Sequence, residues 1–163
     1  MSGLAFDTVS NSPVVLLKER EGTRILPIWI GMNEASVIAL ELSGMSYKRP
    51  LTHDLIKSVL NGFNATLQKI VVSSLKDNTF YAKFYILASE NSIIEIDARP
   101  SDSIAMALKM KAPIYVSQDL DDSFIHLAPP SDEEPSEESD TEATNLRNRL
   151  RNIKPEDFGD FTL

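Results

Sequence analysis

Cysteine is absent from this sequence of 163 residues, and histidine is scarce, with only two residues. Without cysteine the chain can form no disulfide, no catalytic thiolate and no zinc site of the Cys/His type. There is also no glycine-rich phosphate loop and no serine in a nucleophile-elbow pattern. The N-terminus lacks a basic stretch followed by an apolar run, and no apolar run is long enough to span a membrane. We therefore expect a cytoplasmic protein.

Basic residues are missing from one short segment, which holds most of the excess negative charge. The net charge of the chain is −8, yet residues 1–128 carry 14 acidic and 12 basic residues. Residues 130–143 carry seven acidic residues and no basic one. A nearly neutral folded part counts against non-specific binding of nucleic acid, which needs clustered Lys and Arg. It still permits a local basic patch or a contact bridged by a metal ion.

Apolar periodicity predicts an α+β fold with two antiparallel β meanders and three main helices. The strands are predicted at residues 4–9, 14–20, 24–30, 66–75, 79–88, 92–97 and 114–118. Asn33, Thr52 and Ser101 are the expected N-caps of the three helices. Pro27 lies inside the third strand and indicates an edge strand or a bulge, because proline cannot donate a ladder hydrogen bond.

Two of the predicted helices carry enough apolar side chains to raise the question of what covers them. In the second helix we expect a buried stripe at i, i+3, i+4 spacing. This stripe comprises Leu55, Ile56, Val59, Leu60 and Phe63. The first helix is apolar on nearly every face, from Ala35 to Leu42. Since one sheet covers only one side of a helix, we predict a homodimer.

The composition divides the chain into three parts. Residues 1–128 form the predicted α+β domain, and residues 129–143, rich in Pro, Ser and Glu, form a predicted disordered acidic linker. Residues 144–163 form a predicted C-terminal helical tail, in which Leu146, Leu150 and Ile153 have helical spacing.

Polar residues flank the start of the third helix at Asp97, Arg99 and Asp102. Structurally, Ser101 would cap this helix and Asp102 would favour its positive dipole end. Functionally, Arg99 would bind a phosphate in bidentate fashion, while Asp97 and Asp102 would hold Mg²⁺ through oxygen ligands. Both interpretations fit the same residues, and sequence alone leaves both open.

Two further helix starts have similar character. Before the second helix, Arg49 is a candidate phosphate contact, His53 a general base or a ligand, and Asp54 a metal ligand. On the first helix, Glu34 could complete a metal site, although Glu34 and Glu41 at i, i+7 are more typical of a solvated strip. The candidate catalytic residues are thus His53, Asp54, Asp97 and Asp102. The candidate phosphate-binding residues are Arg49 and Arg99, and the candidate metal ligands are Glu34, Asp54, Asp97 and Asp102.

Three long segments together resemble the bifunctional nuclease domain family of bacteria and plants. They are LPIWIGMNEASVIALEL at 26–42, RPLTHDLIKSVL at 49–60 and IDARPSDSIAMALKMKAPIYVS at 96–117. The resemblance covers about residues 1–120 and implies a compact α+β domain, often a homodimer. It also implies nuclease activity on DNA and RNA that depends on a divalent metal, Mg²⁺ or Mn²⁺. The alternative is a non-enzymatic homo-oligomeric regulatory module that binds a small anion or a protein partner.

Overall fold

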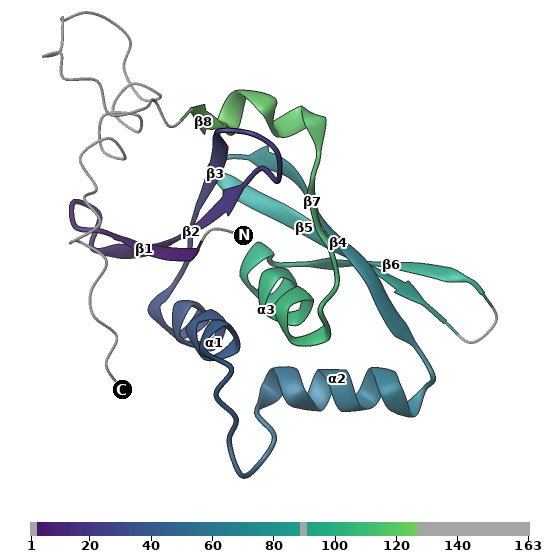
Figure 1. Cartoon of the computed structure of the whole chain (residues 1–163). Helices are drawn as coiled ribbons and strands as arrows, with labels where there is room; N and C mark the ends of the chain where they lie inside the picture. The colour runs from purple at the N-terminus through teal and green to yellow at the C-terminus, as the bar shows by residue number, and fades with distance from the viewer. Residues whose placement is uncertain (1–2, 89–90, 127–163) are drawn as a thin grey trace, which may run out of the picture. The chain divides into compact units, whose positions relative to one another are not determined.

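Residues 3–88 and 91–126 are described by the computed structural model, and they fall into two units (Figure 1). The described part of the first unit comprises residues 3–31 and 123–126, and the second unit comprises residues 32–122. The class is α+β, as predicted, with two sheets of four strands. The acidic linker predicted at 129–143 and the helical tail predicted at 144–163 lie outside the described residues.

The first unit is an antiparallel sheet with strand order β1-β2-β3-β8. Its strands are β1 (Gly3–Asp7), β2 (Ser12–Lys18), β3 (Arg24–Trp29) and β8 (Ile125–His126). The three strands predicted near the N-terminus are therefore confirmed. β8 pairs with β3 only at Arg24 and Ile25. Beyond these two residues β3 is an edge strand, and Pro27 lies in this edge part, where the missing N–H group of proline is tolerated.

The second unit contains the predicted meander of β4 (Thr66–Lys76), β5 (Thr79–Leu87) and β6 (Ile93–Ala98). The sheet order is β6-β5-β4-β7, and β7 (Ile114–Val116) runs parallel to β4. The antiparallel meander is confirmed, and the last predicted strand extends this sheet by a parallel pairing with β4. A parallel pairing needs a crossover connection, and a helix supplies it here.

That helix is α3 (Pro100–Met110), which packs on β4 and β5 and also contacts α1 (Met32–Ser43) and α2 (Thr52–Gly62). A short 3-10 helix, Gln118–Ser123, follows β7. The middle of α3 is completely buried because apolar side chains occupy four consecutive positions, from Ile104 to Ala107. The central helix α3 thus fixes where the neighbouring helices α1 and α2 can place their polar side chains.

The N-caps predicted at Thr52 and Ser101 are wrong by one and two residues. Leu51 is the N-cap of α2, and the backbone N–H of Leu51 donates a hydrogen bond to the carboxylate of Asp54 at 2.9 Å. Arg99 is the N-cap of α3, and Pro100 takes the first helical position. Proline suits that position because its φ angle is already helical and no partner for an N–H group is needed.

The apolar stripe of α2, predicted to be buried, lies mostly at the surface. Leu55, Ile56, Val59 and Phe63 are exposed, and only Leu60 is half-buried. Polar side chains near the start of α2 make its hydrogen-bonded contacts with α3 instead. On α1 only Ile38 is buried, although the helix is apolar on nearly every face.

Within residues 3–88 and 91–126, no helix is both long enough and apolar enough to cross a bilayer.

Candidate functional site

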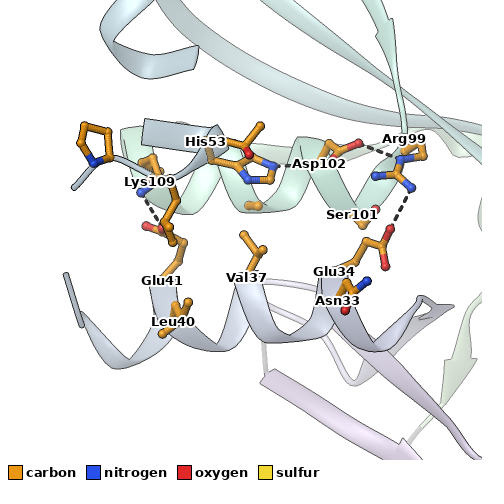
Figure 2. Close-up of a pocket in the computed structure, with 14 residues that line it drawn as sticks. Asn33, Glu34, Val37, Leu40, Glu41, His53, Arg99, Ser101, Asp102 and Lys109 are labelled. Carbon is orange, nitrogen blue, oxygen red and sulfur yellow. Dashed lines mark hydrogen bonds and ion pairs between the residues drawn. The ribbon is translucent and has the colours of Figure 1, made fainter. Parts of the chain in front are cut away.

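A pocket of about 600 Å³ lies where α1, the start of α2 and α3 meet in the second unit (Figure 2). Its apolar wall includes Val37 and Leu40 of α1 and Ala105 of α3. Its polar wall comprises Asn33, Glu34, Glu41, Thr52, His53, Arg99, Ser101, Asp102 and Lys109. All three polar helix starts identified in the sequence therefore contribute side chains to one pocket.

Two ion pairs join α1 to α3 at opposite ends of the pocket. Nη1 of Arg99 donates to Oε1 of Glu34 at 2.8 Å, and Nζ of Lys109 lies 2.6 Å from Oε1 of Glu41. Because the first residues of the helices pair with each other, and so do the last, α1 and α3 run in the same direction (Figure 2). The interpretation of Glu34 and Glu41 as a solvated strip is therefore wrong: both side chains are partly buried and bonded to cations.

His53 and Asp102 form the centre of the polar network. Nε2 of His53 lies 3.3 Å from Oδ1 of Asp102, and the imidazole side chain keeps only 12% of its surface exposed. The second oxygen of Asp102 accepts a hydrogen bond from Nε of Arg99 at 2.8 Å. The hydrogen bonds from Arg99 to Asp102 and to Glu34 raise the pKa of Arg99 above its ordinary value, and Asp102 has the larger effect.

The guanidinium of Arg99 is held in place and still open to solvent. Its side chain is 65% exposed, although two carboxylates fix two of its N–H groups. A guanidinium has five N–H donors, and the bonds to Asp102 and Glu34 use two of them. An exposed guanidinium is a group that can bind a phosphate in bidentate fashion.

Lys109 connects all three helices, because Asp54 of α2 also lies 2.5 Å from its ammonium group. Burial alone would lower the pKa of Lys109, but hydrogen bonds to Asp54 and Glu41 raise it above the ordinary value. The same hydrogen bond from Lys109, together with the Leu51 N–H, lowers the pKa of Asp54. Lys109 is therefore a charged link that holds the start of α2, including His53, against α3.

Three of the predicted site residues, Asp97, Arg49 and Asp54, do not line the pocket. Asp97 is exposed on β6 and lies opposite Lys83 in the register with β5. Arg49 is exposed next to Pro50, which does line the pocket. Asp54 is also outside the pocket lining, but its carboxylate binds Lys109, which does line the pocket.

The predicted metal ligands Glu34, Asp54, Asp97 and Asp102 are not brought together. Across residues 3–88 and 91–126, no group of three or more His, Asp or Glu side chains is arranged to hold a metal ion. Arg99 occupies the space between Glu34 and Asp102, and Lys109 binds Asp54. The four carboxylates as arranged do not fit a divalent ion, and metal dependence stays a prediction from the sequence.

Sequence reasoning did not identify Lys109 as a site residue and did not place Glu41 in the pocket. A signal was present in the spacing, because Glu34 and Glu41 are seven residues apart on α1, as are Asp102 and Lys109 on α3. Seven residues are about two helical turns, so each pair lies on one helix face. This spacing predicts that Lys109 and Glu41 lie on the same helix faces as Asp102 and Glu34, but it does not predict the pairing of Glu34 with Arg99.

Comparison with known proteins identifies the relatives of this chain. The bifunctional nuclease domain model matches residues 15–124. An uncharacterised protein of Mycobacterium tuberculosis is 39% identical over 158 residues, which is 96% of this chain and 94% of the relative. Bifunctional nuclease 1 of Oryza sativa subsp. japonica is 22% identical over 114 residues, and that of Arabidopsis thaliana is 23% identical over 111 residues. Each plant match spans 69% or 66% of this chain and 34% of the plant protein. The chain belongs to the bifunctional nuclease domain family.

Proposed function

We propose that the chain is a nuclease that hydrolyses phosphodiester bonds of DNA and RNA in the pocket between α1, α2 and α3. The main support is the chain of contacts from His53 through Asp102 to Arg99, in which an imidazole and a guanidinium share one carboxylate. The names of the plant relatives agree with this chemistry, at 22–24% identity.

His53 is the proposed general base. When Nε2 carries a proton and donates it to Asp102, Nδ1 has a free lone pair, and Nδ1 has no hydrogen-bond partner among the described residues. Nδ1 can then take a proton from a water molecule that attacks the phosphorus atom. The bond from phosphorus to the leaving oxygen breaks, and that oxygen gains a proton from the imidazolium or from solvent. Asp102 orients the ring and stabilises its charged form, as a carboxylate does in a catalytic triad.

Arg99 is the proposed phosphate contact, and Glu34 and Asp102 fix its orientation. A guanidinium held in place before the substrate arrives stabilises the additional negative charge of the transition state without reorganisation. Arg49, exposed beside the pocket wall at Pro50, is a proposed outer contact for the substrate backbone.

The charge of the pocket bears on the proposed need for Mg²⁺ or Mn²⁺. Glu34, Glu41 and Asp102 line it against the two cations Arg99 and Lys109. A nucleic acid therefore gains little general electrostatic attraction from the pocket. We propose divalent-metal dependence on the family resemblance alone, because the four predicted ligands as arranged do not fit a divalent ion, and no step above is routed through a metal.

A cleavage assay tests the proposal on single- and double-stranded DNA and RNA, each with Mg²⁺, Mn²⁺ or EDTA. We expect cleavage by the unmodified chain and a loss of about 10²–10⁴-fold in kcat for Asp102→Asn, because the base loses its orientation. Asp97→Asn is the matched control, since Asp97 is an exposed aspartate five residues earlier that does not line the pocket. Equal activity of the two variants, or no cleavage of any substrate by the unmodified chain, would contradict the proposal.

The alternative of a homo-oligomeric regulatory module has support of its own. Large apolar side chains are exposed on α2 and on β6, which is unusual for a surface that only solvent covers. We propose that the chain assembles as a homodimer, which is compatible with either function.

A further inference from the structure

The sheet of the second unit has a second face, opposite the one on which α3 packs. Ile70 and Val72 of β4 and Ala82 and Ile86 of β5 are buried, and α3 packs on both of these strands. Since side chains alternate between the two faces of a strand, the residues that alternate with these four point to the opposite face. We call this opposite face the outer face of the sheet.

Three of the four tyrosines of the chain lie close together on the outer face. Tyr81 and Tyr85 are on β5, and Tyr115 is on β7, where it is paired in register with Val71 of β4. Val71 also pairs with Lys83, which lies between the two tyrosines of β5. Tyr81 and Tyr115 are 40% and 53% exposed. The register therefore places the three rings on one continuous surface.

The outer face is basic where these rings lie. Lys69 is paired in register with Tyr85, and its ammonium group lies 4.7 Å from the centre of the Tyr85 ring and 5.7 Å from that of Tyr115. The ammonium group of Lys76 lies 5.9 Å from the centre of the Tyr81 ring. β4, β5 and β7 together contain three lysines and no acidic residue. In a chain with a net charge of −8, this surface is a local basic patch.

Acidic side chains on β6 limit the patch on one side. In register, Glu95 lies opposite Tyr85 and Asp97 lies opposite Lys83. Glu95 also forms an ion pair with Lys83 and neutralises part of its charge. The available positive charge therefore lies over β4, and we expect a negatively charged ligand to lie over β4, β5 and β7 and away from β6.

We infer that the outer face binds single-stranded nucleic acid at Tyr81, Tyr85 and Tyr115. Each nucleotide has both groups that this surface recognises, because its base can stack on a tyrosine ring and its phosphate can bind a lysine ammonium group. A lysine that lies over a ring in the free protein can move to a phosphate when a base takes its place, since base stacking is stronger than an exposed cation–π contact. This surface therefore supplies an attraction for nucleic acid that the pocket lacks.

The spacing of the rings favours a single strand over a duplex. Tyr81 and Tyr85 are four residues apart on one strand, or about 13 Å, and Tyr115 is two strand spacings from β5, or about 10 Å. Bases in a duplex are only about 3.4 Å apart and expose only their edges in the grooves. An unstacked single strand can offer base faces to rings at these distances.

An acidic peptide is a poorer fit to the outer face than a nucleic acid. The acidic segment at residues 130–143 of this chain contains no aromatic residue, so it could bind the lysines but would leave the rings unused.

Tyrosine substitutions in the full chain test the inference. The probe is a fluorescent oligothymidylate of about 12 nucleotides, and its binding is measured by anisotropy in EDTA, so that metal-dependent cleavage does not interfere. Tyr81→Leu and Tyr115→Leu should each raise the Kd by about 5- to 100-fold, because one stacked base is lost. Tyr47→Leu is the matched control and should leave the Kd unchanged, since Tyr47 is 61% exposed and lies between α1 and α2.

Tyr115→Phe separates stacking from a structural role of the side chain. It keeps the ring, so it should bind the probe as tightly as the unmodified chain does, and circular dichroism should show that all variants are folded. If one leucine variant does not fold, the other supplies the comparison. The same probe paired with its complementary strand should bind more weakly than the single strand.

The inference would be overturned if the unmodified chain did not bind the single strand. Folded leucine variants that bind as tightly as Tyr47→Leu would also overturn it, and so would tighter binding of the duplex or of a peptide of residues 130–143. The inference does not rest on the proposed nuclease activity. A chain that binds the probe through these rings and cleaves no substrate contradicts only the proposed function.

Discussion

Asp7 shows at the residue scale how a buried charge is kept by its hydrogen bonds. Its carboxylate accepts hydrogen bonds from the Val9 N–H at 3.0 Å, the Ser10 hydroxyl at 2.6 Å and the Trp29 indole N–H at 3.0 Å. Burial alone would raise the pKa of Asp7, but the bonds from Ser10 and Trp29 outweigh it and hold the pKa far below the ordinary value. Asp7 thus links the turn that joins β1 and β2 to Trp29 on β3.

Replacing Asp7 by Asn should lower the free energy of unfolding by about 1–3 kcal/mol at pH 7, because an amide cannot accept all of these bonds. A lowered pKa contributes stability above the ordinary carboxyl pKa, and this contribution is lost as the pH falls through the lower, folded value. The difference in the free energy of unfolding between the unmodified chain and Asp7→Asn should therefore become smaller from pH 7 to pH 3. Trp29, the single tryptophan of the chain, reports unfolding in urea by its fluorescence. An equal gap at both pH values would contradict this account.

The structure brings together some of the predicted site residues where helix starts converge, and separates Asp97 from them by strand alternation, while their roles stay predictions. His53, Arg99 and Asp102 were predicted as site residues, and the structure places them in contact. Asp97 was grouped with them because it is near in sequence. However, Ile96 lies on the face of β6 that faces α3, and adjacent strand residues point to opposite faces, so Asp97 points away from the pocket side. The alternation was already visible in the sequence.

At the scale of elements, Lys109 carries much of the connection between the three helices. Replacing Lys109 by Met should lower the free energy of unfolding by about 2 kcal/mol, because Glu41 would keep a partly buried charge without a partner. Asp54 should add little, since it is more than a third exposed and solvent screens its charge. Adding Glu41→Gln to Lys109→Met should recover part of the loss, and chemical unfolding of the single and double variants measures this coupling.

The pH dependence provides an independent check on Lys109. Its pKa is raised in the folded protein, so its contribution to stability is fully present below the ordinary lysine pKa and is lost as the pH rises through the folded value. The stability difference between the unmodified chain and Lys109→Met should shrink above about pH 10. A difference that is constant from pH 7 to pH 11 would rule out this role for the ion pairs.

The positions of the elements were more predictable than their partners. Apolar periodicity located α2 and the meander correctly, because local spacing determines these elements. The same periodicity could not show that the apolar stripe of α2 would face away from α3, since polar contacts of His53 and Asp54 decide the orientation of the helix. The N-caps were missed because Pro100 and Asp54 satisfy the helix starts in place of a Ser or Thr hydroxyl.

At the scale of the whole molecule, long-range pairing limited what the sequence could predict. β8 joins β3 across about a hundred residues, and β7 joins β4 through the crossover of α3. Neither pairing leaves a local pattern, because each depends on where the chain returns after other elements have packed. The α+β class required only local signals, whereas the convergence of three helix starts on one pocket depends on how α1 and α2 pack on α3.

The two histidines of the chain provide the most direct test of the proposed function. His53 lies in the pocket, whereas His126 is exposed on β8 in the other unit. The measurement is the rate of phosphodiester cleavage by His53→Gln and by His126→Gln, on the substrate that the unmodified chain cleaves fastest. The account predicts a loss of about 10²–10⁴-fold for His53→Gln, the usual contribution of a general base, and an unchanged rate for His126→Gln. Equal rates for the two variants would contradict it.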